Sequence, residues 1–436
     1  MNQDCPRLQL VLWLGVALGL ASLAGCSRAP QAAAAHDAVS PELAEGPVPD
    51  EGQVTPTAAG LQAISPIYHV DRIYKSMTGP WSSRQLRSLD ATKPELVWIT
   101  GSSVQMVAAD GVTPMPEQFM CHTNFDFDGD WHNDLFQSTT PLDGRLFTLS
   151  QGQLSVQFPP GFGIPVMSNE IIDLSTQVIN LNVKDRAFDV RHKVDISFVR
   201  NDAASGAMKP LYERALMGMV SLEGRGLVPD QKETSTAAEL LHAAHGPCLS
   251  CCVPGMTAVT GYEHSDTLGQ RFSTHWIIKP GREENHTRVT KMMALPFDTT
   301  LHFLAVHIHP FAESLELRDV TADQSLFKSH VRNVSEGIGV ADVEYFTSAA
   351  GIPVYRDHEY ELVSIYNNTT AEDQDSMAVM YAYFLDQNYR GPDTSLAQVH
   401  RETGTLDGEL DDTVQAFNAA TSPATSAGPI CNAEKK

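Results

Sequence analysis

Apolar residues recur in short runs between residues 61 and 387, and these runs are rich in β-branched and aromatic side chains. Gly, Pro, Asn and Asp separate the runs, which favours antiparallel strands over an alternation of strands and helices. The first runs of this kind cover residues 95–100 and 103–107. Because roughly 330 residues exceed one ordinary core, we predict an all-β fold of two antiparallel, jelly-roll-like β-sandwich domains in tandem.

One of these runs, over residues 300–319, contains two histidines one residue apart. Alternate side chains of a strand share a face, so His307 and His309 should project side by side. The opposite face is apolar as well, which predicts an interior strand. Two imidazoles on one such strand can hold a metal ion. The alternative is a pair of buried histidines, each bonded to the backbone or to a carboxylate.

A second run, over residues 373–386, predicts a strand that is entered through an acidic turn. It places Met377 on one face with Val379, Tyr381 and Tyr383. Two imidazoles and a thioether suit copper, because His binds both oxidation states and sulfur favours Cu(I). Zinc rarely takes a thioether ligand. A methionine on a strand is, however, more often part of the core.

These patterns together resemble the copper type II, ascorbate-dependent monooxygenases, a family that includes peptidylglycine alpha-hydroxylating monooxygenase. The resemblance rests on the H-x-H strand, the D-x-M strand and the K-P-G turn at residues 279–281. It implies one copper ion held by His307, His309 and Met377. It also implies an enzyme that hydroxylates a C–H bond of a small molecule or peptide with O₂ and an external electron donor.

An upstream segment extends the resemblance to about residues 95–386. Residues 145–166 end in a P-P-G-F-G turn and a valine strand, and a Gln-Val pair follows at residues 177 and 178. The family has a second, electron-transfer copper site in this half, and here the chain departs from the pattern. Cys121 and His122 stand where the family has a His-His pair, and Ile179, with Asn180 beside it, stands where the family has its third histidine, so two of the three ligands differ.

Cys121 and His122 are therefore the candidate ligands of any second copper site. The alternative is a partly buried His beside a disulfide-bonded Cys. The residues that follow, Asp126, Asp128 and Asp130, alternate around a glycine turn and resemble a short calcium loop. A hard cation of this kind binds several oxygens on a tightly curved backbone. A solvated acidic turn is the competing interpretation.

A cluster rich in Cys and His lies between the predicted domains, after a possible short helix. Its members are His242, His245, Cys248, Cys251 and Cys252. Such ligands could bind Cu(I) or Zn²⁺. Cysteines of exported proteins usually form disulfides, and a redox-active C-x-x-C is a third alternative.

The first 26 residues are typical of a bacterial lipoprotein signal, with a short apolar run that ends in Leu23-Ala24-Gly25-Cys26. Cys26 would carry the lipid, and Ser27 after it indicates the outer membrane. An ordinary signal peptide with a chance Cys is the alternative. We expect an extracytoplasmic protein that contacts the membrane through its lipid anchor alone.

Composition completes the predicted organisation of the chain. Residues 27–60 contain few large apolar side chains, so they cannot offset their chain entropy by burial and should form a flexible linker. The predicted segments are signal peptide 1–26, linker 27–60, lead-in 61–93, first sandwich 94–205, inter-domain segment 206–256, second sandwich 257–387 and tail 388–436.

The formal net charge of −23 argues against nucleic acid and anionic membrane surfaces as partners. Two alternatives to the monooxygenase stay open at this point. One is a non-enzymatic copper-binding or copper-handling lipoprotein that uses the same ligands. The other is a metal-free β-sandwich that serves in adhesion or as a scaffold, because a fold by itself does not determine function.

Overall fold

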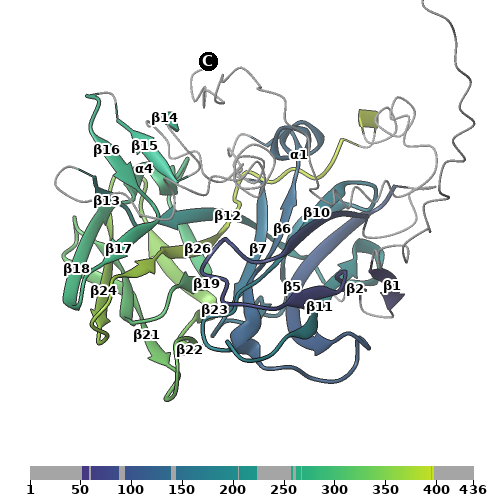
Figure 1. Ribbon diagram of the computed structural model, residues 1–436. Coiled ribbons are helices and arrows are strands. Elements are labelled where there is room, and N and C mark those ends of the chain that lie inside the picture. The colour runs from purple at the N-terminus through teal and green to yellow at the C-terminus, as the bar shows by residue number, and fades with distance from the viewer. Residues whose placement is uncertain are drawn as a thin grey trace, which may run out of the picture. The chain divides into compact units, whose positions relative to one another are not determined.

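β-Strands form most of the computed structural model, and its few helices are short (Figure 1). All described residues belong to one compact unit, Pro49–Lys436. The predicted all-β fold of antiparallel sheets is confirmed. The structure describes residues 52–57, 60–87, 94–138, 144–204, 206–222, 257–258, 262–266, 268–393 and 395–396.

The largest sheet has eleven strands and includes the strand that carries the H-x-H pair. Its main path, in spatial order, is β1 (Gln53–Thr57), β2 (Gly60–Ile64), β11 (Phe188–Arg200), β5 (Leu96–Ala108), β9 (Phe162–Met167), β12 (Lys209–Met217), β26 (Ala378–Leu385), β19 (Thr299–Ile308) and β23 (Phe346–Val354). Two further strands lie beside this path, β3 (Tyr68–Val70) on β11 and β8 (Ser155–Gln157) on β5.

Four smaller sheets complete the described strands. Two have four strands each, β4 (Trp81–Arg87), β10 (Ile171–Val178), β6 (Met120–Phe127) and β7 (Arg145–Ser150), and β13 (Val220–Ser221), β16 (Arg271–Ser273), β15 (Glu263–Ser265) and β14 (Thr257–Ala258). The others are the pair β17 (Trp276–Ile278) with β25 (Gln374–Ser376), and the five strands β18 (Gly281–Arg288), β24 (Tyr360–Asn368), β20 (Ala312–Asp319), β21 (Gln324–Asn333) and β22 (Val340–Val343).

The helical elements are short and lie between strands. They are α1 (Gly129–Phe136), α4 (Thr290–Met293) and the 3₁₀ turns η1 (Glu117–Phe119) and η2 (Asn201–Ala203). Within the part of the chain that the structure describes, no helix has the length and apolar character needed to span a bilayer.

The large sheet contains strands from both predicted sandwich domains. β9 and β12 join the two sets through a short parallel pairing, in which Lys209 lies opposite Phe162. Composition predicted a flexible linker over residues 27–60, but the end of this segment forms strand β1. The run Gln53–Thr57 is ordered because it pairs along its length with β2. The domain boundaries inside residues 61–387 remain predictions.

Strand β5 is continuous across the point where the sequence indicated two strands. At this point β5 contains a β-bulge, because its register with β11 shifts between Ser197 and Phe198. The sequence predicted a break at Gly101, but this glycine has another purpose. A Cβ at this position would lie 2.4 Å from the Val156 carbonyl oxygen of β8. Glycine here permits close strand approach and does not mark a turn.

The predicted interior position of the H-x-H strand is confirmed. β19 lies between β26 and β23 in the sheet, and its residues from Leu301 to Ile308 are all buried. A cluster of rings packs against it: Tyr383 lies 4.9 Å from Phe158 and 5.8 Å from Phe303, measured between ring centroids. The Tyr383 hydroxyl donates to the Leu146 carbonyl of β7 at 2.9 Å. Packing and hydrogen bonding therefore hold this strand rigidly.

We expect Tyr383→Phe to lower the free energy of unfolding by about 1–3 kcal/mol, because it removes the donor of a buried hydrogen bond and keeps the ring. Urea unfolding with an unchanged slope would measure this loss. Tyr345→Phe is the matched control, because the Tyr345 side chain is half exposed and its ring contact with Phe303 survives the change. Equal midpoints for Tyr383→Phe and the parent would contradict the prediction.

Candidate metal centre

Met377 lies in a break between two strands and not inside one continuous strand. β25 ends at Ser376 and β26 begins at Ala378, which divides the strand predicted over residues 373–386. The Met377 carbonyl accepts hydrogen bonds from the His309 backbone N–H at 3.2 Å and from the Tyr366 hydroxyl at 2.7 Å. The break is thus a fixed junction at which two strand pairs meet.

The strand registers bring histidines to both sides of Met377. The register of β17 with β25, extended by one residue, sets His275 opposite Met377. The register of β19 with β26, extended in the same way, sets His309 opposite it. Opposite residues share a face of a sheet, as do residues two apart on a strand. Asp375 therefore joins the same face.

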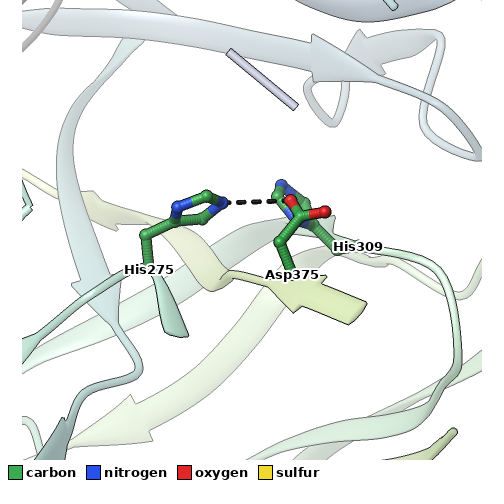
Figure 2. Close-up of side chains that lie close together, drawn as sticks. All are labelled: His275, His309 and Asp375. Carbon is green, nitrogen blue, oxygen red and sulfur yellow. Dashed lines mark hydrogen bonds and ion pairs between the residues drawn. The ribbon is translucent and has the colours of Figure 1, made fainter. Parts of the chain in front are cut away.

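His275, His309 and Asp375 form one compact group (Figure 2). His275 Nε2 lies 3.2 Å and His309 Nδ1 lies 3.3 Å from the same oxygen, Asp375 Oδ2. One ligand atom from each residue lies within 4.8 Å of the other two. The histidines are buried, so the sheet holds two imidazole nitrogens and a carboxylate oxygen around one point.

Opposing effects set the charge state of Asp375. Burial raises the pKa of its carboxyl group, but hydrogen bonds to His275 and His309 outweigh burial and hold the pKa well below the ordinary value. The group therefore contains a carboxylate at neutral pH. A buried carboxylate between two imidazoles is a site that a cation would stabilise, since the cation would offset the cost of burying the charge.

His307 lies beside this group but outside it. Its ring is 5.5 Å from the His309 ring, measured between centroids, and its side chain is buried. His307 Nδ1 is fully buried and has no hydrogen-bond partner among the described residues. Burial lowers the pKa of His307 to about 3, and the charges of His309, Arg145 and His275 add to this effect. The imidazole is therefore neutral, the form that binds metals.

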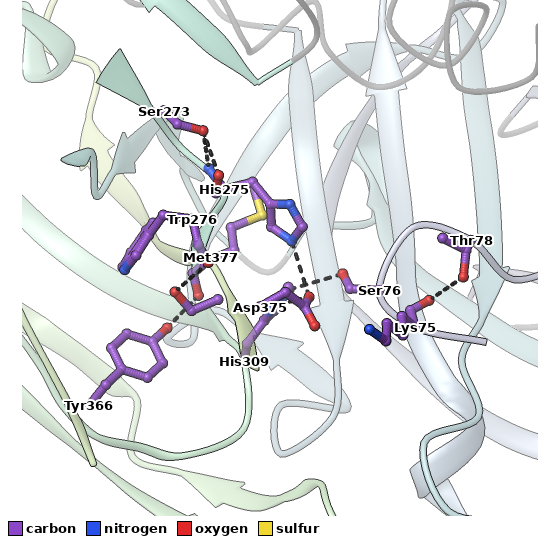
Figure 3. Close-up of polar contacts among 11 residues, drawn as sticks. Lys75, Ser76, Thr78, Ser273, His275, Trp276, His309, Tyr366, Asp375 and Met377 are labelled. Atoms are coloured by element: carbon purple, nitrogen blue, oxygen red, sulfur yellow. Dashed lines mark hydrogen bonds and ion pairs between the residues drawn. The ribbon is translucent and has the colours of Figure 1, made fainter. Parts of the chain in front are cut away.

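Ser76 and Met377 complete the surroundings of His309 and His275 (Figure 3). The Ser76 hydroxyl lies 3.3 Å from His309 Nε2, the ring nitrogen that faces away from Asp375. A partner of this kind orients the ring of a ligating histidine. Figure 3 shows the Met377 thioether pointing toward the His275 ring. The three ligands that the resemblance implies, His307, His309 and Met377, thus lie in one neighbourhood. His275 and Asp375 lie in the same neighbourhood.

A small pocket, partly open to solvent, borders this neighbourhood. Its lining includes Ser76, Cys121, Ile179, His307, His309 and Asp375. Cys121 is a buried free thiol. Burial raises the pKa of the Cys121 thiol to about 12, and the Asp375 charge contributes to the rise. One pocket therefore contains residues that the sequence had assigned to two separate copper sites.

The donor set fits a transition metal. Two imidazoles and a carboxylate suit Zn²⁺, Fe(II) and Cu(II), so these three ligands do not by themselves select a metal. The neighbouring thioether of Met377 and the buried His307 nitrogen shift the chemistry toward copper, because soft sulfur ligands favour Cu(I). The residues that would hold the ion are His275, His309 and Asp375. Met377 and His307 lie next to them.

The other candidate ligand in the first half, His122, lies in β6 opposite Gln177 and is buried, but it does not line the pocket. Ile179, which stands where the family has its third histidine, does line the pocket but offers no ligand atom. The side chain of Asn180 donates to the carbonyl oxygens of Arg72 and Val183 at 2.7 Å. This residue thus anchors a turn of the chain.

The three aspartates of the predicted calcium loop lie in different local settings. Asp126 is buried and forms an ion pair with Arg145. Asp128 caps helix α1 by accepting a hydrogen bond from the Trp131 N–H at 3.0 Å, and Asp130 lies in the first turn of that helix. Calcium at these positions stays a prediction.

Several predicted features lie outside the described residues. They are the lipoprotein signal with Cys26, most of the linker and tail, and the cluster of His242, His245, Cys248, Cys251 and Cys252.

Two residues of the group, His275 and Asp375, were not named as ligands from the sequence. Asp375 had a usable signal, because it lies two residues before Met377 and strand alternation places both on one face. His275 was one of several histidines in the second half, with nothing local to distinguish it. Only the pairing of β17 with β25 places it beside Asp375.

Comparison with known proteins adds no relative. No family model and no curated protein matches the chain. Among solved structures, the infectious bursal disease virus Gx strain is 6% identical, with 78% of this chain and 75% of that chain covered and a TM-score of 0.18. The plant receptor-like kinase ANX2 is 5% identical, with 76% and 85% covered and a TM-score of 0.17. Likenesses this weak carry no argument.

We expect the metal-free protein to lose stability as the pH falls below 6.5. The pKa of His307 is about 3 in the folded chain against an ordinary 6.5, so the unfolded chain binds this proton first. The contribution is fully present above pH 6.5 and is lost as the pH falls toward 3. Between pH 7 and 5 the loss is about 2 kcal/mol.

Urea unfolding at pH 7, 6 and 5 measures this loss. His307→Gln should flatten the pH dependence by about the same amount, because glutamine binds no proton. His330→Gln is the control, since the His330 side chain is exposed. Parallel pH curves for the parent and His307→Gln would show that burial of this ring does not govern acid stability.

Proposed function

We propose that the chain is a copper-dependent monooxygenase that hydroxylates a C–H bond of an organic substrate with O₂ and an external electron donor. The observation that supports it most is the convergence of His275, His309 and Asp375 within 4.8 Å on a rigid, buried sheet face. The resemblance of the H-x-H and D-x-M strands to the copper type II monooxygenases supplies the reaction type.

Each residue has a role that its contacts suggest. His275, His309 and Asp375 hold the ion, and Ser76 orients the His309 ring. Met377 supplies the thioether that favours the reduced state. Copper in such a site supplies one-electron and O₂ chemistry, whereas the protein contributes orientation and a shaped pocket. The substrate would approach the ion from the side of the small pocket beside His309.

The electron donor and the cellular location follow from the same proposal. The second copper site of the family is not reproduced at Ile179, so electrons come from an external reductant. A lipid anchor at Cys26 would hold the enzyme outside the cytoplasm, where a small diffusible reductant and O₂ both have access. A copper-handling lipoprotein with the same ligands is the competing function.

We expect the full chain to bind copper at this group and to consume O₂ when ascorbate is supplied. His309→Ala should lower copper affinity at the site by at least about 100-fold, since even the loss of an orienting partner costs about 10–100-fold. His275→Ala and Asp375→Asn should have the same effect. Metal content after loading with Cu²⁺, Fe²⁺ or Zn²⁺ gives the identity of the ion, and an oxygen electrode measures turnover.

His358→Ala is the matched control for these variants. His358 Nδ1 lies 2.6 Å from Asp319 Oδ2, so the pair reproduces one imidazole and one carboxylate without a second imidazole. Its loss should leave the copper content unchanged. Copper binding that needs His309 but never leads to O₂ consumption would favour copper handling. Selective retention of Fe²⁺ over copper would reject the copper assignment.

We expect Met377→Leu to weaken Cu(I) binding while Cu(II) binding changes little, because leucine keeps the volume and removes the sulfur. The midpoint potential should fall by about 59 mV for each tenfold loss of Cu(I) affinity. Redox titration of the loaded protein measures it. Met106→Leu, in the buried core of β5, is the control. Identical potentials for Met377→Leu and the parent would remove Met377 from the site.

A further inference from the structure

Cys121 is directed into the pocket by an irregularity of strand β6. The register of β6 with β10 shifts between Gln177 and Val178, so that Val178 lies opposite Met120 and Cys121 becomes the extra residue of a β-bulge. Bulges redirect side chains and recur beside functional sites. The thiol is 7% exposed and lines the same pocket as His307 and His309.

His307 is the second unusual group of this pocket. Its side chain is 8% exposed, and its buried Nδ1 makes no hydrogen bond to any described residue. Buried polar side chains nearly always have a partner, and an exception calls for an explanation such as an ion. The imidazole belongs to β19, which packing holds rigid, so it cannot turn away to find a partner elsewhere.

The two side chains share a neighbour. Ser76 lines the pocket with Cys121 and His307, and its hydroxyl lies 3.3 Å from His309 Nε2. Cys121 and His307 are nevertheless outside the group of ligand atoms that His275, His309 and Asp375 form. Both line the pocket beside that group, so a thiol and an imidazole are available there as a separate pair of ligands.

We propose that Cys121 and His307 form a sulfur–nitrogen position for Cu(I) in the pocket that also holds the His275, His309 and Asp375 group. This inference rests on the proposed copper function. Thiolate and imidazole together favour Cu(I), whereas imidazoles with a carboxylate favour Cu(II). Binding replaces the thiol proton: Cys121–SH and Cu⁺ give Cys121–S–Cu and a proton released to solvent, and no electron is transferred.

The test is an anaerobic titration of the full chain with Cu(I) against a Cu(I) chelator. Cys121→Ser and His307→Gln should each lose one and the same Cu(I) equivalent, so the double variant loses no more than either single one. His302→Gln is the matched control, because His302 lies on the same strand but contacts Thr300 and Ser348. It should keep the full count.

X-ray absorption at the copper edge supplies a second, independent readout. All proteins in this measurement carry Cys248→Ser, Cys251→Ser, Cys252→Ser, Met377→Leu and Met120→Leu, which removes the cysteines of the predicted Cys/His cluster and the Met377 and Met120 thioethers near the pocket. Sulfur scattering from Cu(I) should remain in this background and disappear when Cys121→Ser is added. It should also decrease when His307→Gln is added to the background, because this variant keeps the Cys121 thiol but removes its partner ligand. This second variant decides the question if Cys121→Ser does not fold.

The double variant His275→Gln, Asp375→Asn separates this inference from the proposed function. We expect it to lose the Cu(II) position and to keep one Cu(I) with sulfur scattering. The inference is overturned if Cys121→Ser keeps the parent's Cu(I) count and affinity, or if the losses in Cys121→Ser and His307→Gln add up. Failure of Cu(II) binding alone, with the Cys121 position intact, would overturn the proposed function instead.

Discussion

The Met377 carbonyl accepts two hydrogen bonds, from the His309 N–H and the Tyr366 hydroxyl, and this shared acceptor holds three strands at one point. β25 must end there and β26 must begin there, so the pairings with β17 and β19 share a boundary. The geometry of the candidate centre follows from it. His275 and His309 reach the same carboxylate because both strands are in register with the same break.

The local parts of this arrangement could be predicted from the sequence, and the non-local parts could not. Alternation in the H-x-H run identified an interior strand and the face shared by His307 and His309. His275 and Asp375 come together across 100 residues through the β17–β25 pairing, which no local pattern encodes. Cys121 depends on a β-bulge, and a one-residue bulge leaves no clear mark in composition.

Desolvation explains why so many ionisable groups in one pocket are compatible with a stable fold. Burial suppresses the charge of His307 and keeps the Cys121 thiol protonated, whereas hydrogen bonds from His275 and His309 keep the Asp375 carboxyl group ionised. Two candidate ligands of the pocket, the His307 imidazole and the Cys121 thiol, are thus held in their neutral forms beside the Asp375 carboxylate. Ligands that are neutral at rest avoid mutual repulsion and remain available to a cation.

The hydrogen bond between Ser76 and His309 joins residues 233 positions apart. Ser76 belongs to the early part of the chain, whereas His275, His309 and Asp375 come from the later part. Contacts of such long range form late in folding, after the local strand pairs. The orienting partner of His309 is therefore in place only when the early and late parts have docked. A chain still emerging from a ribosome or an export channel would lack this contact, so the candidate centre would be complete only in the finished fold.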